Sequence, residues 1–182
     1  MKIHDLPIFK DELNEIKLAE TLGEHVIHMR ETLEKHPAKE HIPMLFLRVI
    51  ERGTFKVENM LIGLANLDEN RHEMIFHLGE EIGTKFIPIH AIMVSEAWMS
   101  SAPMDGSPYI PPSKNPDRKE VMMFALTTIE LKTIGSMNQI DRDADGNIKL
   151  GEQLNIGENG GMQSNLLVEF FKGAMSQLQQ KA

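Results

Sequence analysis

The segment IPIHAIMVSEAWM at positions 87–99 is apolar on both of its alternating faces. In an extended strand successive side chains point to opposite faces, so a run that is apolar at both parities has no face suited to water. Such runs are typical of strands in a sheet that is covered on both sides. The segment therefore predicts a strand in the centre of a sheet.

Periodic patterns before this strand indicate a helix followed by a hairpin. From 11 to 36, apolar residues recur at intervals of three to four positions, which predicts an amphipathic helix, broken near Gly23. Two β-rich runs follow at 44–51 and 54–64. The Arg52-Gly53 pair between them predicts an antiparallel hairpin.

A second helix, a long loop and further strands are expected beyond the hairpin. Asp68 is a good N-cap for a helix whose apolar stripe ends near Gly83. The stretch 100–117 is rich in Pro, Ser, Gly and Asn and predicts a loop. A β pattern then runs from Lys119 to the aspartates around 141 and returns after them, and a last helix covers 164–178.

The order of elements predicts an α+β fold. It reads helix, two strands, helix, three strands, helix, which is typical of a mixed or antiparallel sheet with helices packed on it. A chain of 182 residues with 41% hydrophobic content fits a single domain, 1–182. Its N-terminal helix spans about 11–36, and its sheet-based core spans about 43–182.

Composition excludes several classes of protein. A net charge of −8 repels a phosphate backbone, and the basic residues form no long cluster, so no nucleic acid is expected as a partner. The chain has no cysteine, which suits a reducing compartment. It has neither the apolar run of a signal peptide nor an apolar stretch of about 20 residues. We therefore expect a soluble, cytoplasmic protein that does not span a membrane.

The segment DRDADGNIKLGE at 141–152 matches the calcium-loop pattern of an EF-hand at nearly every ligand position. The resemblance covers these residues only, and no helical stripe flanks them. Asp145-Gly146 between alternating apolar segments instead favours a tight hairpin turn. In a returning strand Glu152 would lie about 20 Å from Gly146, beyond the reach of an ion at the tip. We expect a hairpin whose aspartates are solvated turn residues.

A second pattern resembles a nuclease signature. Asp117 after Pro116, followed by Glu130 and Lys132, is similar to the PD…ExK arrangement in which two carboxylates hold a divalent metal. The residues 121–129 carry no turn signal, so one strand would separate the carboxylates by roughly 40 Å. They are not expected to meet on one ion.

A candidate binding site lies at the end of the central strand. Glu96 occupies a strand that is expected to be buried, so its carboxylate requires a partner. If the strand after the Pro-rich loop pairs antiparallel with it, Arg118 or Lys119 arrives beside Glu96. The favoured interpretation is that Glu96 and Arg118 form an ion pair that anchors the loop. The alternative is a pocket under a loop flap. The residues proposed for this site are Ser95, Glu96, Trp98, Tyr109, Asp117 and Arg118.

Three segments of the second half of the chain resemble a known group of proteins. They are VSEAWMS at 94–100, PPSKNPDRKEV at 111–121 and the hairpin segment at 140–152. They are similar to uncharacterised bacterial and phage-type proteins that share a SEAW strand, a PDRKE strand start and an RDxxG hairpin. That group has no assigned activity, so the resemblance implies a shared domain and no reaction.

These observations favour a non-catalytic binding or assembly domain. We expect a homo-oligomer formed through a sheet edge or the last helix, with a protein or small molecule as partner. In the last helix, Phe170, Phe171 and Met175 would form the contact, although packing in the core explains these residues equally well. The alternative is a metal-dependent hydrolase or nuclease, or a calcium-stabilised module. No catalytic residue, metal ligand or cofactor is predicted, because the eight histidines lack the spacing of known zinc sites.

Overall fold

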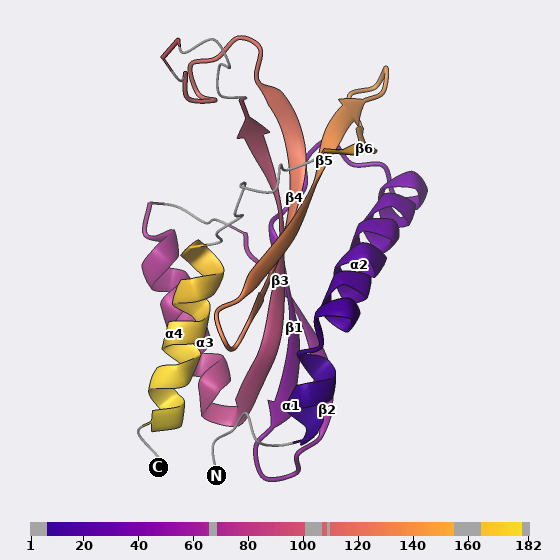
Figure 1. Ribbon diagram of the computed structural model, residues 1–182. Helices are drawn as coiled ribbons and strands as arrows, with labels where there is room; N and C mark the ends of the chain where they lie inside the picture. The colour runs from indigo at the N-terminus through magenta and orange to yellow at the C-terminus, as the bar shows by residue number, and fades with distance from the viewer. Residues whose placement is uncertain (1–6, 66–68, 101–106, 109, 155–164, 180–182) are drawn as a thin grey trace.

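A six-stranded antiparallel sheet forms the middle layer of the protein, and helices cover both of its faces (Figure 1). The computed structural model describes residues 7–65, 69–100, 107–108, 110–154 and 165–179. The α+β class and the sheet predicted from the sequence are confirmed. Along the described chain the elements are α1 (Pro7–Glu12), α2 (Glu15–Lys35), β1 (Met44–Glu51), β2 (Val57–Gly63), α3 (Arg71–Lys85), β3 (Phe86–Met99), β4 (Lys119–Thr128), β5 (Thr133–Arg142), β6 (Ile148–Leu154) and α4 (Asn165–Gln179).

The strands lie in the order β2-β1-β3-β4-β5-β6. The chain leaves the β1–β2 hairpin through α3 and returns as β3, which pairs with the inner strand β1 rather than with β2. From β3 onwards each strand pairs with the next along the chain. The central position predicted for 87–99 is therefore confirmed, although burial is complete only as far as Val94 and declines towards Met99.

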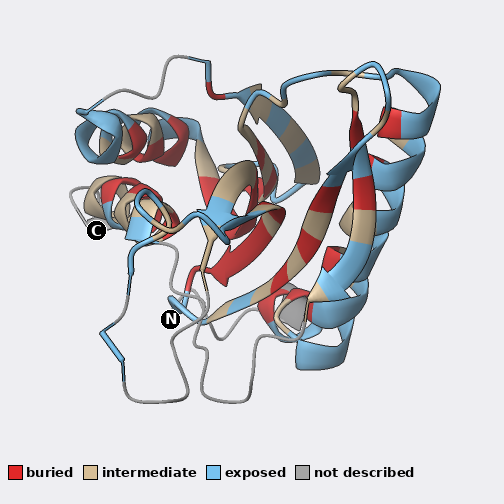
Figure 2. Cartoon of the chain, turned by 90° about the horizontal axis from the view of Figure 1, so that it is seen from above, coloured by how far each residue is buried: buried red, intermediate tan, exposed pale blue. Residues whose placement is uncertain are grey.

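The two faces of β3 contribute to two separate cores. Ile89, Ala91 and Met93 pack with α3 and α4 on one face. Ile92 and Val94 pack with α2 on the other. Figure 2 shows buried residues on the central strands and on the sides of the helices that face them, while the outer sides of the helices are exposed. The apolar residues on the two faces of β3 thus fill two cores instead of one.

Helices α3 and α4 lie side by side and approach each other very closely (Figure 1). A Cβ atom built on Gly79 would lie within 3.0 Å of the Phe170 carbonyl oxygen, and one on Gly173 would meet the Phe76 carbonyl oxygen in the same way. Real Cβ atoms do not come so close to backbone. The contact therefore requires glycine on both helices.

Three predicted boundaries are wrong in the helical segments. The segment 11–36 is two helices, and the break falls at Asn14, not at Gly23, because the extended Asn14 caps α2 through its side chain. The next helix begins at Arg71 after Asn70, whereas Asp68 lies outside the described residues. That helix continues to Lys85, beyond the predicted end at Gly83.

The number of strands after α3 is also corrected, from three to four. The predicted continuous strand from Lys119 to the aspartates reverses direction at 129–132, between β4 and β5. Leu131 adopts a φ of 62° in this turn, a conformation that glycine or asparagine usually supplies. The turn therefore carries no recognisable residue signal.

The β1–β2 hairpin is confirmed, with Gly53 at a φ of 91° in its turn. Strand β2 begins at Val57 rather than 54, because Phe55 has a φ of 57° and cannot extend the strand. On α4, Phe170 and Phe171 are buried, so core packing rather than an exposed contact face accounts for these two residues. No helix within the described ranges is both long and apolar enough to cross a membrane.

Candidate functional site

A row of polar side chains crosses four neighbouring strands on the face that α2 covers. The strand register places Asn59 of β2 opposite Arg48 of β1, Arg48 opposite His90 of β3, and His90 opposite Thr128 of β4. Cross-strand partners lie about 5 Å apart on the same face of a sheet. The register therefore brings together four polar residues that are far apart in the sequence.

Strand alternation explains why these side chains face α2. Leu47 and Ile89 pack in the core under α3 and α4, and their neighbours Arg48 and His90 point to the opposite side. Ile92, two residues after His90, packs against α2. The polar row therefore lies on the same face of the sheet as the apolar residues that pack against α2.

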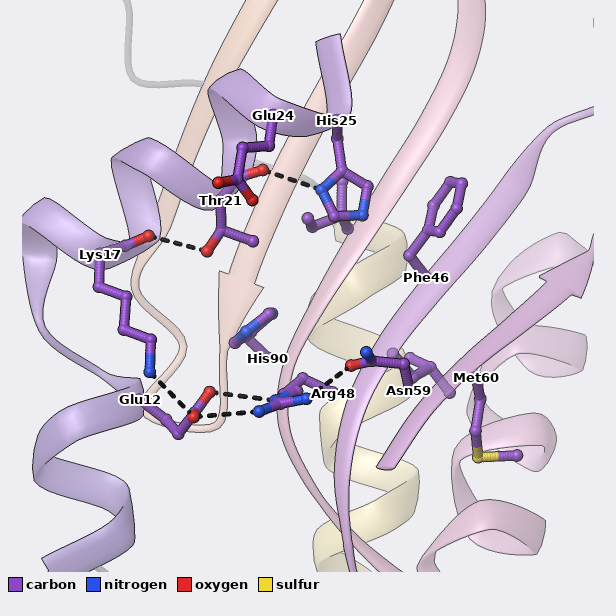
Figure 3. Close-up of a pocket in the computed structure, with 12 residues that line it drawn as sticks. Glu12, Lys17, Thr21, Glu24, His25, Phe46, Arg48, Asn59, Met60 and His90 are labelled. Carbon is purple, nitrogen blue, oxygen red and sulfur yellow. Dashed lines mark hydrogen bonds and ion pairs between the residues drawn. The ribbon is translucent and has the colours of Figure 1, made fainter. Parts of the chain in front are cut away.

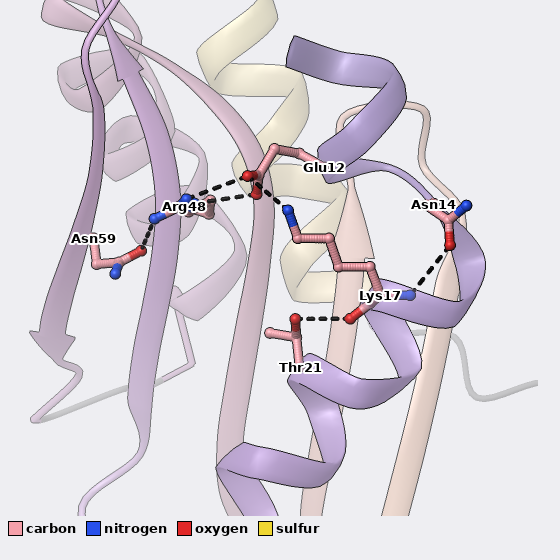
Figure 4. Close-up of polar contacts among 6 residues, drawn as sticks. All are labelled: Glu12, Asn14, Lys17, Thr21, Arg48 and Asn59. Atoms are coloured by element: carbon pink, nitrogen blue, oxygen red, sulfur yellow. Dashed lines mark hydrogen bonds and ion pairs between the residues drawn. The ribbon is translucent and has the colours of Figure 1, made fainter.

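The junction between α1 and α2 adds a carboxylate above this row. Asn14 Oδ1 accepts hydrogen bonds from the backbone N–H groups of Ile16 at 3.0 Å and Lys17 at 3.3 Å. This N-cap starts α2 and turns the chain directly after Glu12, the last residue of α1. The turn places the Glu12 carboxylate above Arg48 (Figure 4).

Glu12 is held by two cations. Arg48 donates from Nε to Oε2 at 3.1 Å and from Nη2 to Oε1 at 3.2 Å, and Lys17 Nζ lies 3.0 Å from Oε1 (Figure 4). The Glu12 side chain is only 11% exposed. Burial alone would raise the pKa of this carboxyl, but hydrogen bonds and charges from Arg48 and Lys17 outweigh burial and lower it. Glu12, the last residue of α1, therefore connects this helix to Arg48 of the sheet.

His90 is a deeply buried member of the row, at 6% exposed. Its Nδ1 has no hydrogen-bond partner among the described residues, and the same is true of the neighbouring Thr128 Oγ1. Burial lowers the pKa of His90 to about 4, although the Glu12 charge opposes this shift. The imidazole is therefore neutral at pH 7. Buried polar atoms are almost always paired, so an unpaired one marks a place where a polar molecule can bind.

A cavity of about 360 Å³ lies between α2 and strands β1 to β3, and we call it the α2 cavity (Figure 3). Glu12, Arg48 and Asn59 form its polar end, while His25 and Phe46 lie at the other end, with His90 between them. Arg48 Nη1 donates to Asn59 Oδ1 at 3.0 Å, which fixes the amide. The cavity therefore has a polar floor and an aromatic end.

The aromatic end of the cavity is also ordered. His25 Nδ1 donates to the Thr21 carbonyl oxygen at 2.8 Å, one turn earlier in α2. The His25 ring meets Phe46 edge to face, with centroids 4.8 Å apart. Both rings are held by their neighbours, so this end offers a preformed apolar wall.

The site predicted at the end of β3 is assembled differently from expectation. The antiparallel pairing of β3 and β4 is confirmed and sets Met99 opposite Lys119. Arg118, however, lies over the ring of Trp98, with its Cζ 4.2 Å from the centroid, in a cation–π contact. The ion pair predicted between Glu96 and Arg118 is wrong.

Glu96 has other partners. Its Oε1 accepts from the His41 backbone N–H at 2.6 Å, and its Oε2 lies 3.8 Å from Arg142, which also pairs with Glu120. Burial raises the pKa of this carboxyl more than the His41 hydrogen bond lowers it. The positive charge that balances Glu96 therefore comes from Arg142 on β5. This partner was not predicted, because the turn between β4 and β5 was not predicted.

The remaining predicted site residues do not gather around Glu96. Ser95 points to the opposite face of β3 from Glu96, because strand side chains alternate. Asp117 is exposed, and its backbone N–H donates to Asn115 Oδ1 at 2.9 Å. Tyr109 lies outside the described residues. Of the predicted set, the structure brings together Trp98 and Arg118.

The hairpin predicted for 141–152 is confirmed. Asp143 Oδ1 accepts from the backbone N–H groups of Asp145 at 3.0 Å and Asn147 at 2.9 Å, and Gly146 has a φ of 82°. Asp141 lies on β5 and Glu152 on β6, beyond the turn. In the part of the chain that the structure describes, no three His, Asp or Glu side chains gather as a metal site requires.

The nuclease-like residues lie at opposite ends of β4. Asp117 precedes the strand and Glu130 follows it, where Glu130 forms an ion pair with Lys132 at 3.6 Å. The single long strand assumed for these residues is wrong, since the chain turns at 129–132. The separation of the two carboxylates nevertheless follows from the length of β4.

The α2 cavity was not predicted from the sequence. Its two central residues were visible as a charged and a titratable side chain inside strongly apolar strands, Arg48 in MLFLRVIE and His90 in IPIHAIMV. A polar residue at a core-facing position indicates a partner elsewhere in the chain. The partner, Glu12, belongs to a helix whose boundary was also missed.

Comparisons with known proteins add no assignment, since no protein-family model, curated protein or solved structure matches the chain. The resemblance to uncharacterised bacterial and phage-type proteins stays a prediction. Function is therefore argued from the geometry of the α2 cavity.

Proposed function

We propose that this chain is a non-catalytic binding domain that takes a small polar molecule into the α2 cavity. The observation that carries this proposal is His90, which is buried beside the cavity with an unpartnered Nδ1. Leaving a buried polar group unpaired costs about 1–3 kcal/mol, and a bound molecule that pairs with it recovers that cost. The fixed Glu12–Arg48–Asn59 network supplies orientation at the cavity floor.

Binding is favoured over catalysis by the protonation states of these residues. A general base works best when its pKa is near the working pH. His90 has a pKa of about 4 and is a weak base at pH 7. Glu12, whose pKa is lowered, is engaged by Arg48 and Lys17. These groups are suited to holding a molecule rather than to moving protons.

The proposal is tested by mapping ligand contacts by NMR. A fragment panel of carboxylates, phosphates, amines and neutral amides is added to the labelled protein, and backbone amide shifts are followed. Hits are expected to perturb residues around Arg48, Asn59 and His90, and His90→Leu should weaken them. A panel in which no compound perturbs the cavity, or in which all hits lie elsewhere, would contradict the proposal.

Assembly is a second candidate, favoured by the edge strand β2. Its Leu61 is 60% exposed, and one side of the strand is unpaired within the described residues. An exposed strand edge with apolar side chains is a template for pairing with a second copy of the chain. Light scattering after size exclusion should then give a dimer mass, and Leu61→Lys should return the protein to a monomer. A monomeric wild-type protein would exclude this role.

A further inference from the structure

We propose that the ligand of the α2 cavity is a small monocarboxylate with an apolar body, such as an aromatic or short aliphatic acid. This inference rests on the proposed binding function and names its chemical class. It is carried by three features of the cavity: its unused hydrogen-bond donors, the positive charge of its floor and its apolar end.

The polar floor has more donors than acceptors. Both Glu12 oxygens already accept hydrogen bonds from Arg48 or Lys17. Asn59 Oδ1 accepts from Arg48, which leaves both N–H groups of its amide without an acceptor among the described residues. Lys17 uses one of its three N–H groups on Glu12. A ligand that fits this floor must therefore bring acceptors.

The charge of the floor selects an anion with a single charge. Two cations, Lys17 and Arg48, surround one carboxylate, Glu12, so this group carries one net positive charge. A monocarboxylate neutralises it. A doubly charged phosphate would leave an excess negative charge beside Glu12. Glu24, the second carboxylate of the lining, lies at the other end of the cavity, beside His25 (Figure 3).

The far end of the cavity suits an apolar body. Phe46, Ile92 and the His25 ring form this part of the lining, and Phe46 and His25 are fixed by their edge-to-face contact. A volume of about 360 Å³ is at the small end of ligand pockets, which run from about 300 to 1,000 Å³. Acids of the size of benzoate or hexanoate fit this space with their carboxylate towards Asn59, Arg48 and His90, which lies directly opposite Arg48 in the sheet.

The test uses benzoate and hexanoate, with benzamide and inorganic phosphate as comparisons, in NMR titrations of the full-length protein. Asn59→Asp keeps an acceptor for Arg48 but removes two donors and adds a negative charge. Asn59 is exposed, so the variant should fold. Gln153→Glu is the matched control, because Gln153 is an exposed amide on the opposite edge strand, β6.

We expect both acids to perturb the amides around Arg48, Asn59 and His90, and benzamide and phosphate to bind far more weakly. Asn59→Asp should weaken benzoate binding by about tenfold or more, and Gln153→Glu should not change it. If benzamide binds the cavity as tightly as benzoate, or if Asn59→Asp has no effect, the ligand class is wrong while the binding function stands. If none of the panel compounds enters the cavity, both proposals fail.

Discussion

On one face of the sheet, α3 and α4 meet backbone to backbone at Gly79 and Gly173, whereas on the other face α2 leaves a cavity above a polar row. The first face is closed by apolar residues and by the close glycine contact between the two helices. The second contains Arg48 and His90, whose polar atoms prevent a dry core. We therefore place the proposed binding function on the face with incomplete packing, and the predictions below test this contrast.

The largest effect on stability is expected at the contact between α3 and α4. Gly79→Ala places a methyl group against the Phe170 carbonyl, where backbone must move to admit it. We predict a loss of about 3 kcal/mol or more in the free energy of unfolding, measured by urea denaturation. Gly23→Ala on α2 is the matched control, because nothing lies within 4 Å of a Cβ at that position. It should gain up to about 1 kcal/mol from helix propensity; equal effects at both glycines would refute the contrast.

The next prediction concerns His90, on the face of the sheet that α2 covers, and its contribution to the pH dependence of stability. Its pKa falls from 6.5 to about 4 on folding, so between these pH values the unfolded chain binds a proton that the folded chain does not. Stability therefore falls as pH decreases from 6.5 to 4, by up to about 3 kcal/mol. His90→Leu should remove this slope, which urea midpoints at several pH values would reveal. An unchanged slope in the variant would assign the pH dependence to another group.

A smaller loss in the free energy of unfolding is expected when the ion pairs of Glu12 with Arg48 and Lys17 are removed. Glu12→Gln leaves Arg48 and Lys17 without their carboxylate, but both cations are partly exposed, at 29% and 48%. We predict a loss of about 2 kcal/mol at pH 7, below the range for a fully buried pair. The pKa of Glu12 is lowered in the folded state, so this contribution is present above 4.5 and disappears as pH falls further. Wild type and variant should therefore converge in strong acid; a constant difference would argue against the ion pair.

The smallest effect is expected where no helix covers the sheet. Arg118→Ala removes the cation from the face of Trp98, which is 48% exposed, and should cost less than about 1 kcal/mol. Trp98 is the only tryptophan, so a change in fluorescence reports on this contact alone. Arg118→Lys should restore part of the signal. Identical spectra for the wild type and Arg118→Ala would show that the ring and the guanidinium are not in contact.

The sequence allowed much of the fold to be predicted, because its signals were local. Both parities of 87–99 were apolar, and Gly53 and Gly146 marked turns whose positive φ they supply. The β4–β5 turn was missed because Leu131, a residue with no turn preference, adopts the positive φ. The partner assignment for Glu96 failed with it, since Arg142 comes from the strand that this turn creates.

The candidate site was less predictable because it depends on contacts between distant segments. Glu12 and Arg48 are 36 positions apart, and His90 joins them only through the order of strands in the sheet. The helix break at Asn14 decides where Glu12 lies, and a side-chain cap is a weaker signal than a glycine or proline. Polar residues inside apolar strands were the available clue.

The central claim is that His90 is buried and neutral beside a cavity that admits a ligand. NMR titration of the His90 ring, alone and with benzoate, tests it directly. We predict that the free imidazole stays neutral until about pH 4 and that benzoate shifts its resonances at pH 7. An imidazole that titrates near 6.5 and does not respond to benzoate would contradict it.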